Sequence, residues 1–193
     1  MLIHDQYPLA HARLAEALVQ LDEQDRAQNV ALYAIQLVPD RSRLDRSDAL
    51  YLDAITNTVR RAFADAIENY VALVDLLPDG PEVRFELGRA YEIDDQPEKA
   101  LSEFDAAVEA NPRYAAAHVW RGVLLGRDSR LNEALDSFDE AERLSLSNPE
   151  GRIEAIYQRG ALMNALRRYA DAATEHERAL GLAVEFQQRD QQI

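Results

Sequence analysis

Residues 81–114 read PEVRFELGRAYEIDDQPEKALSEFDAAVEANPRY, and this stretch decides the fold. The next 34 residues, 115–148, carry small and aromatic residues at the same places. Gly88 and Gly122 are 122 − 88 = 34 residues apart, and the same offset relates Ala100 to Ala134, Phe104 to Phe138 and Ala107 to Ala141. Several residue types that recur at one offset indicate a repeat protein, in which each unit packs on the next.

The residues of this unit resemble the tetratricopeptide repeat family. They match every signature position of that family except the first tryptophan, where Arg84 stands; the matching residues are Leu87, Gly88, Tyr91, Ala100, Phe104, Ala107 and Pro112. The resemblance implies an all-α fold, a right-handed superhelical α-solenoid of about five antiparallel helix pairs without a β-sheet. No window alternates apolar and polar residues long enough to predict a strand.

The same register extends in both directions and predicts a single array. Ala54 takes the glycine place in the unit before, and Ala15 takes it in a degenerate first unit. Gly160 follows Gly122 by 160 − 122 = 38 residues, so four extra residues fall near residues 147–151. The predicted repeats are approximately 8–41, 47–80, 81–114, 115–148 and 153–186, with 187–193 as a polar tail or the start of a further helix.

Small residues and prolines explain why this register produces helix pairs. Gly88 and Gly122 predict close approach of the first helix to small residues of the second, such as Ala100. Glycine inside a helix costs about 1 kcal/mol relative to alanine, so its recurrence indicates a packing requirement. Pro97 suits the first turn of a second helix. Prolines also predict where second helices end, at Pro39, Pro78 and Pro112.

The resemblance implies that the first helices line a concave groove. The positions that face the groove in this family select ten candidate binding residues here: Tyr51, Ile55, Phe85, Arg89, Val119, Trp120, Val123, Arg127, Tyr157 and Asn164. Aromatic side chains suit the apolar side chains of a peptide, and arginines suit a carboxylate or backbone carbonyls. The alternative is that these side chains pack against neighbouring repeats. Three nearby glutamates are expected on a solvated face, or else to favour a basic or neutral ligand: Glu82, Glu86 and Glu92.

Some members of the family hold the acidic C-terminal tails of chaperones with a clamp of lysines and asparagines. The corresponding positions here carry aromatic and aliphatic residues: Tyr51, Ile55, Phe85 and Val119. These side chains cannot supply the basic or amide groups of that clamp. The sequence therefore argues against an acidic chaperone tail as the ligand.

The composition excludes several classes of function. The net charge of −14 would repel a polyanion, which argues against nucleic acid as a partner. The absence of cysteine excludes disulfides, thiolate metal sites and cysteine nucleophiles. Neither a His-Glu-x-x-His motif, a glycine-rich phosphate loop nor a Gly-x-Ser-x-Gly elbow is present, and the histidines are scattered, at His4, His11, His118 and His176. We therefore predict no catalytic residue, no metal ligand and no cofactor.

These observations predict a non-catalytic scaffold that binds a peptide or a partner protein in its concave groove. The expected ligand has apolar anchors and neutral or basic character. Two alternatives stay open. The chain is a docking or regulatory segment of a larger bacterial signalling enzyme, such as a serine/threonine kinase, or of a transcription regulator; or it is a self-association module that forms a homo-oligomer through an uncapped end. With no apolar run of about 18 residues and no basic-then-apolar N-terminus, we expect a cytoplasmic protein without a membrane partner.

Overall fold

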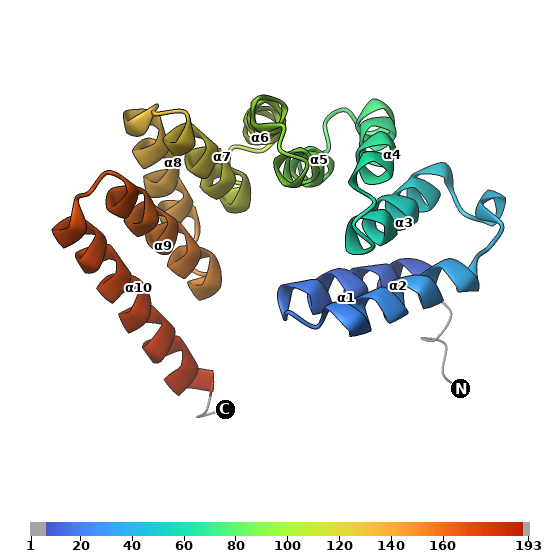
Figure 1. The fold of residues 1–193 in the computed structure, drawn as a ribbon, viewed down its shortest axis with the longest axis horizontal. Coiled ribbons are helices and arrows are strands. Elements are labelled where there is room, and N and C mark those ends of the chain that lie inside the picture. Colours follow the sequence, from blue (N-terminus) through green and yellow to red (C-terminus); the bar gives the residue numbers. More distant parts are fainter. Residues whose placement is uncertain (1–6, 191–193) are drawn as a thin grey trace. The chain divides into compact units, whose positions relative to one another are not determined.

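A computed structural model describes residues 7–190, which fold into ten α-helices and one short 3₁₀ helix, with no strand in this range (Figure 1). The all-α prediction is confirmed. In chain order the helices are α1 (Pro8–Gln20), α2 (Gln24–Leu37), η2 (Arg41–Arg43), α3 (Arg46–Val59), α4 (Phe63–Leu76), α5 (Pro81–Ile93), α6 (Pro97–Ala110), α7 (Ala115–Arg127), α8 (Leu131–Leu144), α9 (Pro149–Ala165) and α10 (Tyr169–Asp190).

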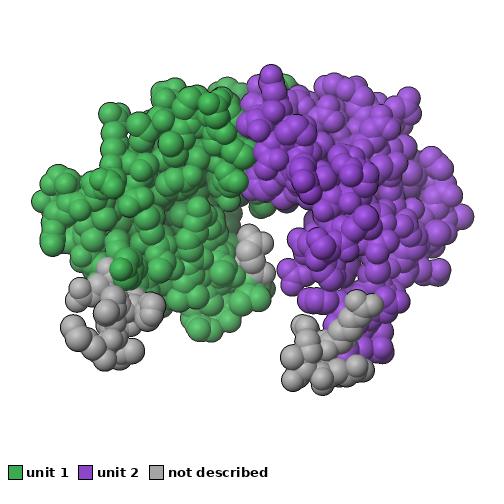
Figure 2. Space-filling model, turned by 180° about the vertical axis from the view of Figure 1, so that it is seen from behind, with its two compact units in different colours: residues 1–100 green, residues 101–193 purple. Residues whose placement is uncertain are grey.

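The chain divides into two compact units, residues 1–100 and 101–193, and the division falls within α6 (Figure 2). In unit 1, α1 packs on α2, and α3 packs on α4, on α1 and on α2; α5 packs on α4. In unit 2, α7 packs on α8, and α9 packs on α10 and on α8. The sequence predicts one array over residues 1–193, of which 1–6 and 191–193 lie outside the described range. The boundary between the units divides the pair of α5 and α6.

The five turns inside the helix pairs share one geometry. Each has three residues, and the middle residue adopts the left-handed conformation; these residues are Asp22, Arg61, Asp95, Ser129 and Arg167, with φ between 56° and 63°. In each turn, the N–H of the next residue donates to the carbonyl oxygen five residues earlier at 2.9 Å, for example Ala62 to Asn57. This is the Schellman arrangement, which satisfies carbonyls at the end of a helix and reverses the chain.

These turns are spaced along the chain like the predicted register. From Arg61 to Asp95 and from Asp95 to Ser129 the offset is 34 residues, and from Ser129 to Arg167 it is 167 − 129 = 38. The four extra residues lengthen the first helix of the last pair, since α9 has 17 residues and α7 has 13. At the other end, α10 continues through Asp190, so residues 187–190 belong to it; residues 191–193 lie outside the described range.

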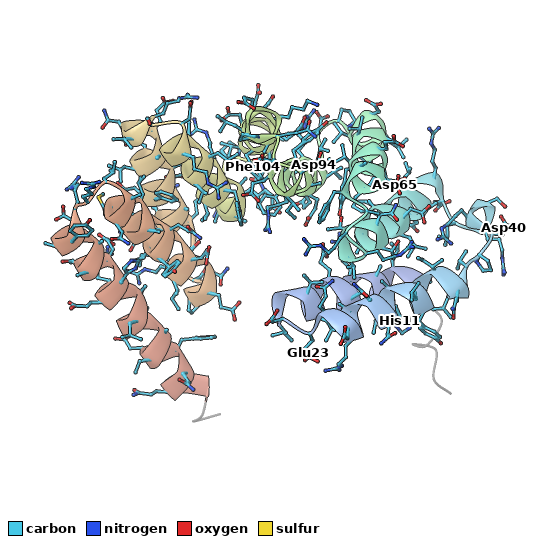
Figure 3. All side chains as sticks on the ribbon, in the orientation of Figure 1. His11, Glu23, Asp40, Asp65, Asp94 and Phe104 are labelled. Atoms are coloured by element: carbon cyan, nitrogen blue, oxygen red, sulfur yellow. The ribbon has the colours of Figure 1, made fainter. Side chains whose placement is uncertain are left out.

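Extra residues also separate the first two pairs, where η2 lies. The carboxylate of Asp40 accepts hydrogen bonds from the backbone N–H of Ser42 at 3.0 Å and from its hydroxyl at 2.7 Å (Figure 3). Arg41 then forms an ion pair with Asp53 on α3 at 2.8 Å. Asp53 occupies the position of its repeat that Leu87 occupies in the unit 81–114, directly before the small residue. The ion pair explains how a charged residue is accommodated at this position.

Candidate functional site

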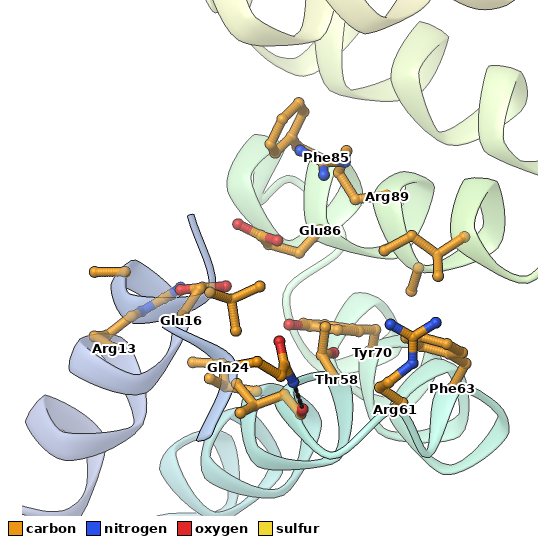
Figure 4. A pocket seen from close by; sticks show the side chains of 16 residues that line it. Arg13, Glu16, Gln24, Thr58, Arg61, Phe63, Tyr70, Phe85, Glu86 and Arg89 are labelled. Carbon is orange, nitrogen blue, oxygen red and sulfur yellow. Dashed lines mark hydrogen bonds and ion pairs between the residues drawn. The ribbon is translucent and has the colours of Figure 1, made fainter. Parts of the chain in front are cut away.

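A cavity of about 600 Å³ lies within unit 1 (Figure 4). The first helices of three successive pairs, α1, α3 and α5, supply most of its lining, and α4, the first residue of α2 and the turn after α3 complete it. The lining residues are Arg13, Glu16, Ala17, Val19, Gln24, Ile55, Thr58, Val59, Arg61, Phe63, Tyr70, Phe85, Glu86, Arg89, Ala90 and Ile93.

One register position recurs along these three helices. Glu16, Ile55 and Arg89 each follow the small residue of their own repeat, and all three line the cavity. Side chains at equivalent places of stacked repeats face the same side because the helices repeat the same packing. In unit 1 the three first helices thus line one cavity. Glu16 was not among the ten residues that the sequence predicts for the groove. Applying the same offset to Ala15 would have found it.

The apolar part of the cavity has a rigid base. Ile55 and Val59 belong to the hydrophobic core of the first helix pairs and are 1% and 2% exposed. Phe85 is 8% exposed, and Tyr70 is 1% exposed within the next core cluster. Phe63 is half-buried and adds a second phenyl ring to the lining. These side chains form fixed apolar walls because their own contacts with neighbouring helices hold them.

Charged groups occupy the part of the cavity near α1. Nη1 of Arg13 donates to Oε2 of Glu16 at 2.8 Å, and the guanidinium lies over the ring of Tyr51, 5.7 Å from its centroid. Arg61 lies over the ring of Phe63 in the same way, at 5.6 Å. Both contacts are within the range of cation–π interactions.

Glu86 is the most perturbed acid of the cavity. Its half-buried side chain extends from α5 into the cavity (Figure 4). Burial raises the pKa of its carboxyl to about 7; the negative charge of Glu16 adds to the rise, and Arg13 and Arg89 oppose it. The expectation that Glu86 lies on a solvated face is wrong, because the helices of the two preceding pairs enclose it. Acids with such a shift are enriched at functional sites.

The hydroxyl of Tyr70 lies in the same electrostatic environment. Burial raises its pKa most, the charges of Glu86 and Glu16 raise it further, and a hydrogen bond with Thr58 acts in the opposite direction. Tyr70 is therefore neutral at physiological pH. The Tyr70 hydroxyl and the Glu86 carboxyl are thus two polar groups beside the apolar wall of the cavity.

The ten residues predicted for the groove have different positions in the structure. In unit 1, Ile55, Phe85 and Arg89 line the cavity, and Tyr51 lies beneath the guanidinium of Arg13. Ile55 forms the base of the cavity and also belongs to the hydrophobic core, where it is 1% exposed.

In unit 2, Val123 and Arg127 line a smaller cavity of about 240 Å³, together with Gly122, Gly126, Phe138, Gln158, Ala161, Leu162 and Ala165. Val119 is 3% exposed and belongs to the core of unit 2. The ring of Trp120 lies 6.5 Å from that of Phe104. Tyr157 is 51% exposed, with its ring 5.2 Å from the imidazole of His176, and Asn164 is exposed near the end of α9.

Sequence reasoning missed the other polar and aromatic members of the unit 1 cavity. Arg13 and Glu86 share a register position, two residues before the small residue of their repeats, so the repeat itself carried that signal. Tyr70 and Phe63 lie on α4, and no rule for first helices would select them.

Two further properties concern the described range 7–190. It contains no group of three or more histidine, aspartate or glutamate side chains arranged to hold a metal ion. None of its helices is both long and apolar enough to cross a membrane.

Helix pairs closed by identical turns, with first helices lining a cavity, define a helical-repeat protein of the α-solenoid class. Residues 94–149 match the family model described as tetratricopeptide repeat. The structure resembles TTC0263, a thermophilic tetratricopeptide repeat protein of Thermus thermophilus, with a TM-score of 0.68 and 26% identity over 95% of this chain and 97% of that one. Residues 94–149 are therefore tetratricopeptide repeat sequence, and the fold of the chain is that of tetratricopeptide repeat proteins.

Two more similarities are informative. YrrB, described as a tetratricopeptide repeat protein with an unusual peptide-binding site, has a TM-score of 0.59 and 21% identity over 89% of this chain and 84% of that one. The UDP-N-acetylglucosamine–peptide N-acetylglucosaminyltransferase of Giardia intestinalis is 29% identical over 97 residues, which are 50% of this chain. The match spans only 7% of that enzyme's length.

Proposed function

We propose that this chain is a non-catalytic protein-interaction scaffold that binds a peptide segment of a partner in the cavity of unit 1. The observation that carries the proposal is the convergence of three successive first helices, α1, α3 and α5, on one cavity of about 600 Å³. Cavities of this size, with apolar walls and a few charged groups, are the usual form of a ligand site. The description of YrrB as a peptide-binding relative in fold supports the same conclusion.

The lining favours a peptide with apolar anchors. Phe85, Phe63 and Ile93 offer aromatic and aliphatic surface, and Ile93 is 41% exposed. A buried apolar or aromatic anchor supplies most of the affinity at such sites, while the surrounding contacts mainly exclude water.

A selection with random twelve-residue peptides displayed on phage tests the proposal. Ala17 is exposed on α1 and lines the cavity, so Ala17→Trp should fill the cavity without removing a core contact. Peptides selected on the unsubstituted chain should bind this variant at least about tenfold more weakly. Ala10→Trp is the matched control, since Ala10 is exposed on the same helix and does not line the cavity. Selected peptides that bind all three proteins equally would refute binding at this cavity.

The match to a much longer glycosyltransferase favours a second candidate function. A 97-residue similarity that spans 7% of an enzyme supports a role as a docking or regulatory segment of a larger enzyme. The genomic reading frame tests this candidate. Coding sequence for a catalytic domain in the same frame would support it, and stop codons that flank residues 1–193 would refute it.

A further inference from the structure

We propose that the unit 1 cavity binds the cationic side chain of a lysine or arginine in a partner peptide, at the carboxylate of Glu86. The inference rests on the proposed function, since it names the chemical class of the peptide that the cavity accepts. It depends on the position of the Glu86 side chain in the cavity, on the contacts that the neighbouring arginines make with other residues, and on the net charge of the chain.

Within the described residues, Glu86 forms no hydrogen bond and no direct ion pair through its carboxylate. Its side chain is half-buried and extends into the cavity (Figure 4). The neighbouring acid differs, because Glu16 accepts a hydrogen bond from Arg13 at 2.8 Å. A partly buried carboxylate without a direct ion pair is unfavourable, and a positive ligand group in contact with it would reduce that penalty.

Other groups already contact Arg13 and Arg61, two arginines of the lining. Arg13 is paired with Glu16 and lies over Tyr51, and Arg61 lies over Phe63. Their guanidinium groups therefore have favourable contacts within unit 1. The charge of Glu16 also acts on Glu86, so two carboxylates share this end of the cavity, and a cation placed there is attracted by both.

The walls beside Glu86 suit the rest of a basic side chain. Phe85 supplies aromatic surface, and the aliphatic stem of lysine or arginine packs well on such surface while its charged end reaches a carboxylate. The net charge of the chain, −14, adds a long-range attraction for a basic peptide.

Binding to Glu86 should depend on pH. The charged and titratable groups around it are Arg13 and Glu16 of α1, Tyr51 of α3, Arg61 of the turn after α3, Tyr70 of α4 and Arg89 of α5 itself. With a pKa of about 7, Glu86 is about one-tenth ionised at pH 6 and about nine-tenths ionised at pH 8. A cation that binds the ionised form should therefore bind about tenfold more tightly at pH 8 than at pH 6.

The test uses phage sub-libraries that differ at one central position, fixed as lysine, methionine or glutamate, in otherwise random peptides. Methionine keeps much of the length of lysine without its charge. The best lysine-centred peptide is then synthesised in lysine and norleucine forms, and its affinity is measured by fluorescence anisotropy at pH 6 and pH 8.

Two variants distinguish an interaction with the carboxylate of Glu86 from the long-range attraction by the net negative charge of the chain. Glu86→Gln and Glu82→Gln each remove one negative charge from the same helix, and Glu82 is exposed and does not line the cavity. Glu86→Gln should weaken binding of the lysine peptide about tenfold, leave the norleucine peptide unchanged and abolish the pH dependence. Glu82→Gln should leave all three measurements unchanged. Circular dichroism checks that both variants stay folded.

The outcomes distinguish this inference from the proposed function. Peptides that lose affinity for Ala17→Trp but bind Glu86→Gln and the unsubstituted chain equally would overturn the cation site and leave peptide binding in the cavity intact. Enrichment of the glutamate sub-library over the lysine sub-library would also overturn it. Peptides that are insensitive to Ala17→Trp would refute the proposed function itself.

Discussion

A methyl group on Gly122 would lie 2.8 Å from Cε1 of Phe138, closer than two carbon atoms approach unless one of them moves. Gly122 lies on the first helix of its pair and Phe138 on the second. The same relationship links Gly160 to His176, where the distance to Cε1 would be 2.7 Å. The repeated glycine therefore allows an aromatic ring to pack directly on the backbone of the first helix.

Gly122→Ala should destabilise the protein by about 2 kcal/mol, because Phe138 is 1% exposed and cannot move without disturbing the core. Gly160→Ala should cost less, since the ring of His176 is only half-buried and can shift. Gly181→Ala is the control: nothing lies within 4 Å of a Cβ there, so the better helix propensity should stabilise α10 by about 1 kcal/mol. Urea unfolding measures all three, and equal effects of Gly122→Ala and Gly181→Ala would contradict this packing argument.

Ser129→Gly should stabilise the fold. Ser129 has a φ of 63°, a conformation that costs a residue with a side chain about 1 kcal/mol relative to glycine. We expect the free energy of unfolding to rise by about 0.5–1 kcal/mol. Asp136→Gly provides the comparison, because this exposed residue lies inside α8, where glycine should cost about 1 kcal/mol. A loss of stability with Ser129→Gly would argue against the left-handed turn.

Arg159→Met should destabilise unit 2 by only about 2 kcal/mol, because Arg178 still pairs with the carboxylates of Glu142 and Glu175. Nη2 of Arg159 donates to Glu142 at 2.9 Å and to Glu175 at 2.8 Å, and Arg159 is only 9% exposed, so its loss leaves two poorly solvated carboxylates without this cation. Arg168→Met tests the specificity, since Arg168 and Asp171 form an exposed pair in which removal should change stability by less than about 0.5 kcal/mol.

The ion pairs of Arg159 with Glu142 and Glu175 should also make the stability of the protein depend on pH. Burial raises the pKa of Glu142, but the hydrogen bond from Arg159 and the positive charges of Arg178 and Arg159 outweigh it, so the pKa lies below its ordinary value. A lowered folded-state pKa stabilises the protein above the unfolded-state value, and this contribution is lost as pH falls through the folded-state value. The difference between Arg159→Met and the unsubstituted chain should therefore be largest at about pH 7 and smallest at about pH 3.

Glu86→Gln should stabilise the protein at alkaline pH. The folded-state pKa of Glu86, about 7, lies above the ordinary value of 4.5, so the folded state holds its proton more tightly than the unfolded state. Stability is then lost as pH rises between these two values and stays low above about pH 7. The variant should exceed the unsubstituted chain by about 2 kcal/mol at pH 8 and match it near pH 4. Parallel stability curves for the two proteins would contradict the raised pKa.

The contacts within helix pairs followed from the sequence because the repeat register converts spacing directly into packing. Gly122 and Phe138 illustrate this, since each has counterparts at fixed offsets along the chain. The candidate site was less predictable. Phe85 and Arg89 were found by their register and do line the cavity, whereas Val119, selected by the same rule, is a core residue. Register specifies the face of a helix, but not the depth of burial on that face.

The sequence by itself determined the helical hairpins of this protein, because the small-residue contacts that hold each hairpin together repeat along the chain. Only the tertiary structure decided the burial and the pKa of Glu86. Its environment combines groups from α1, α3 and α4 that lie up to about 70 residues away in sequence, and burial by these helices shifts its titration towards neutral pH. Solvation and charge depend on the whole enclosure, and no local pattern of residues encodes that enclosure.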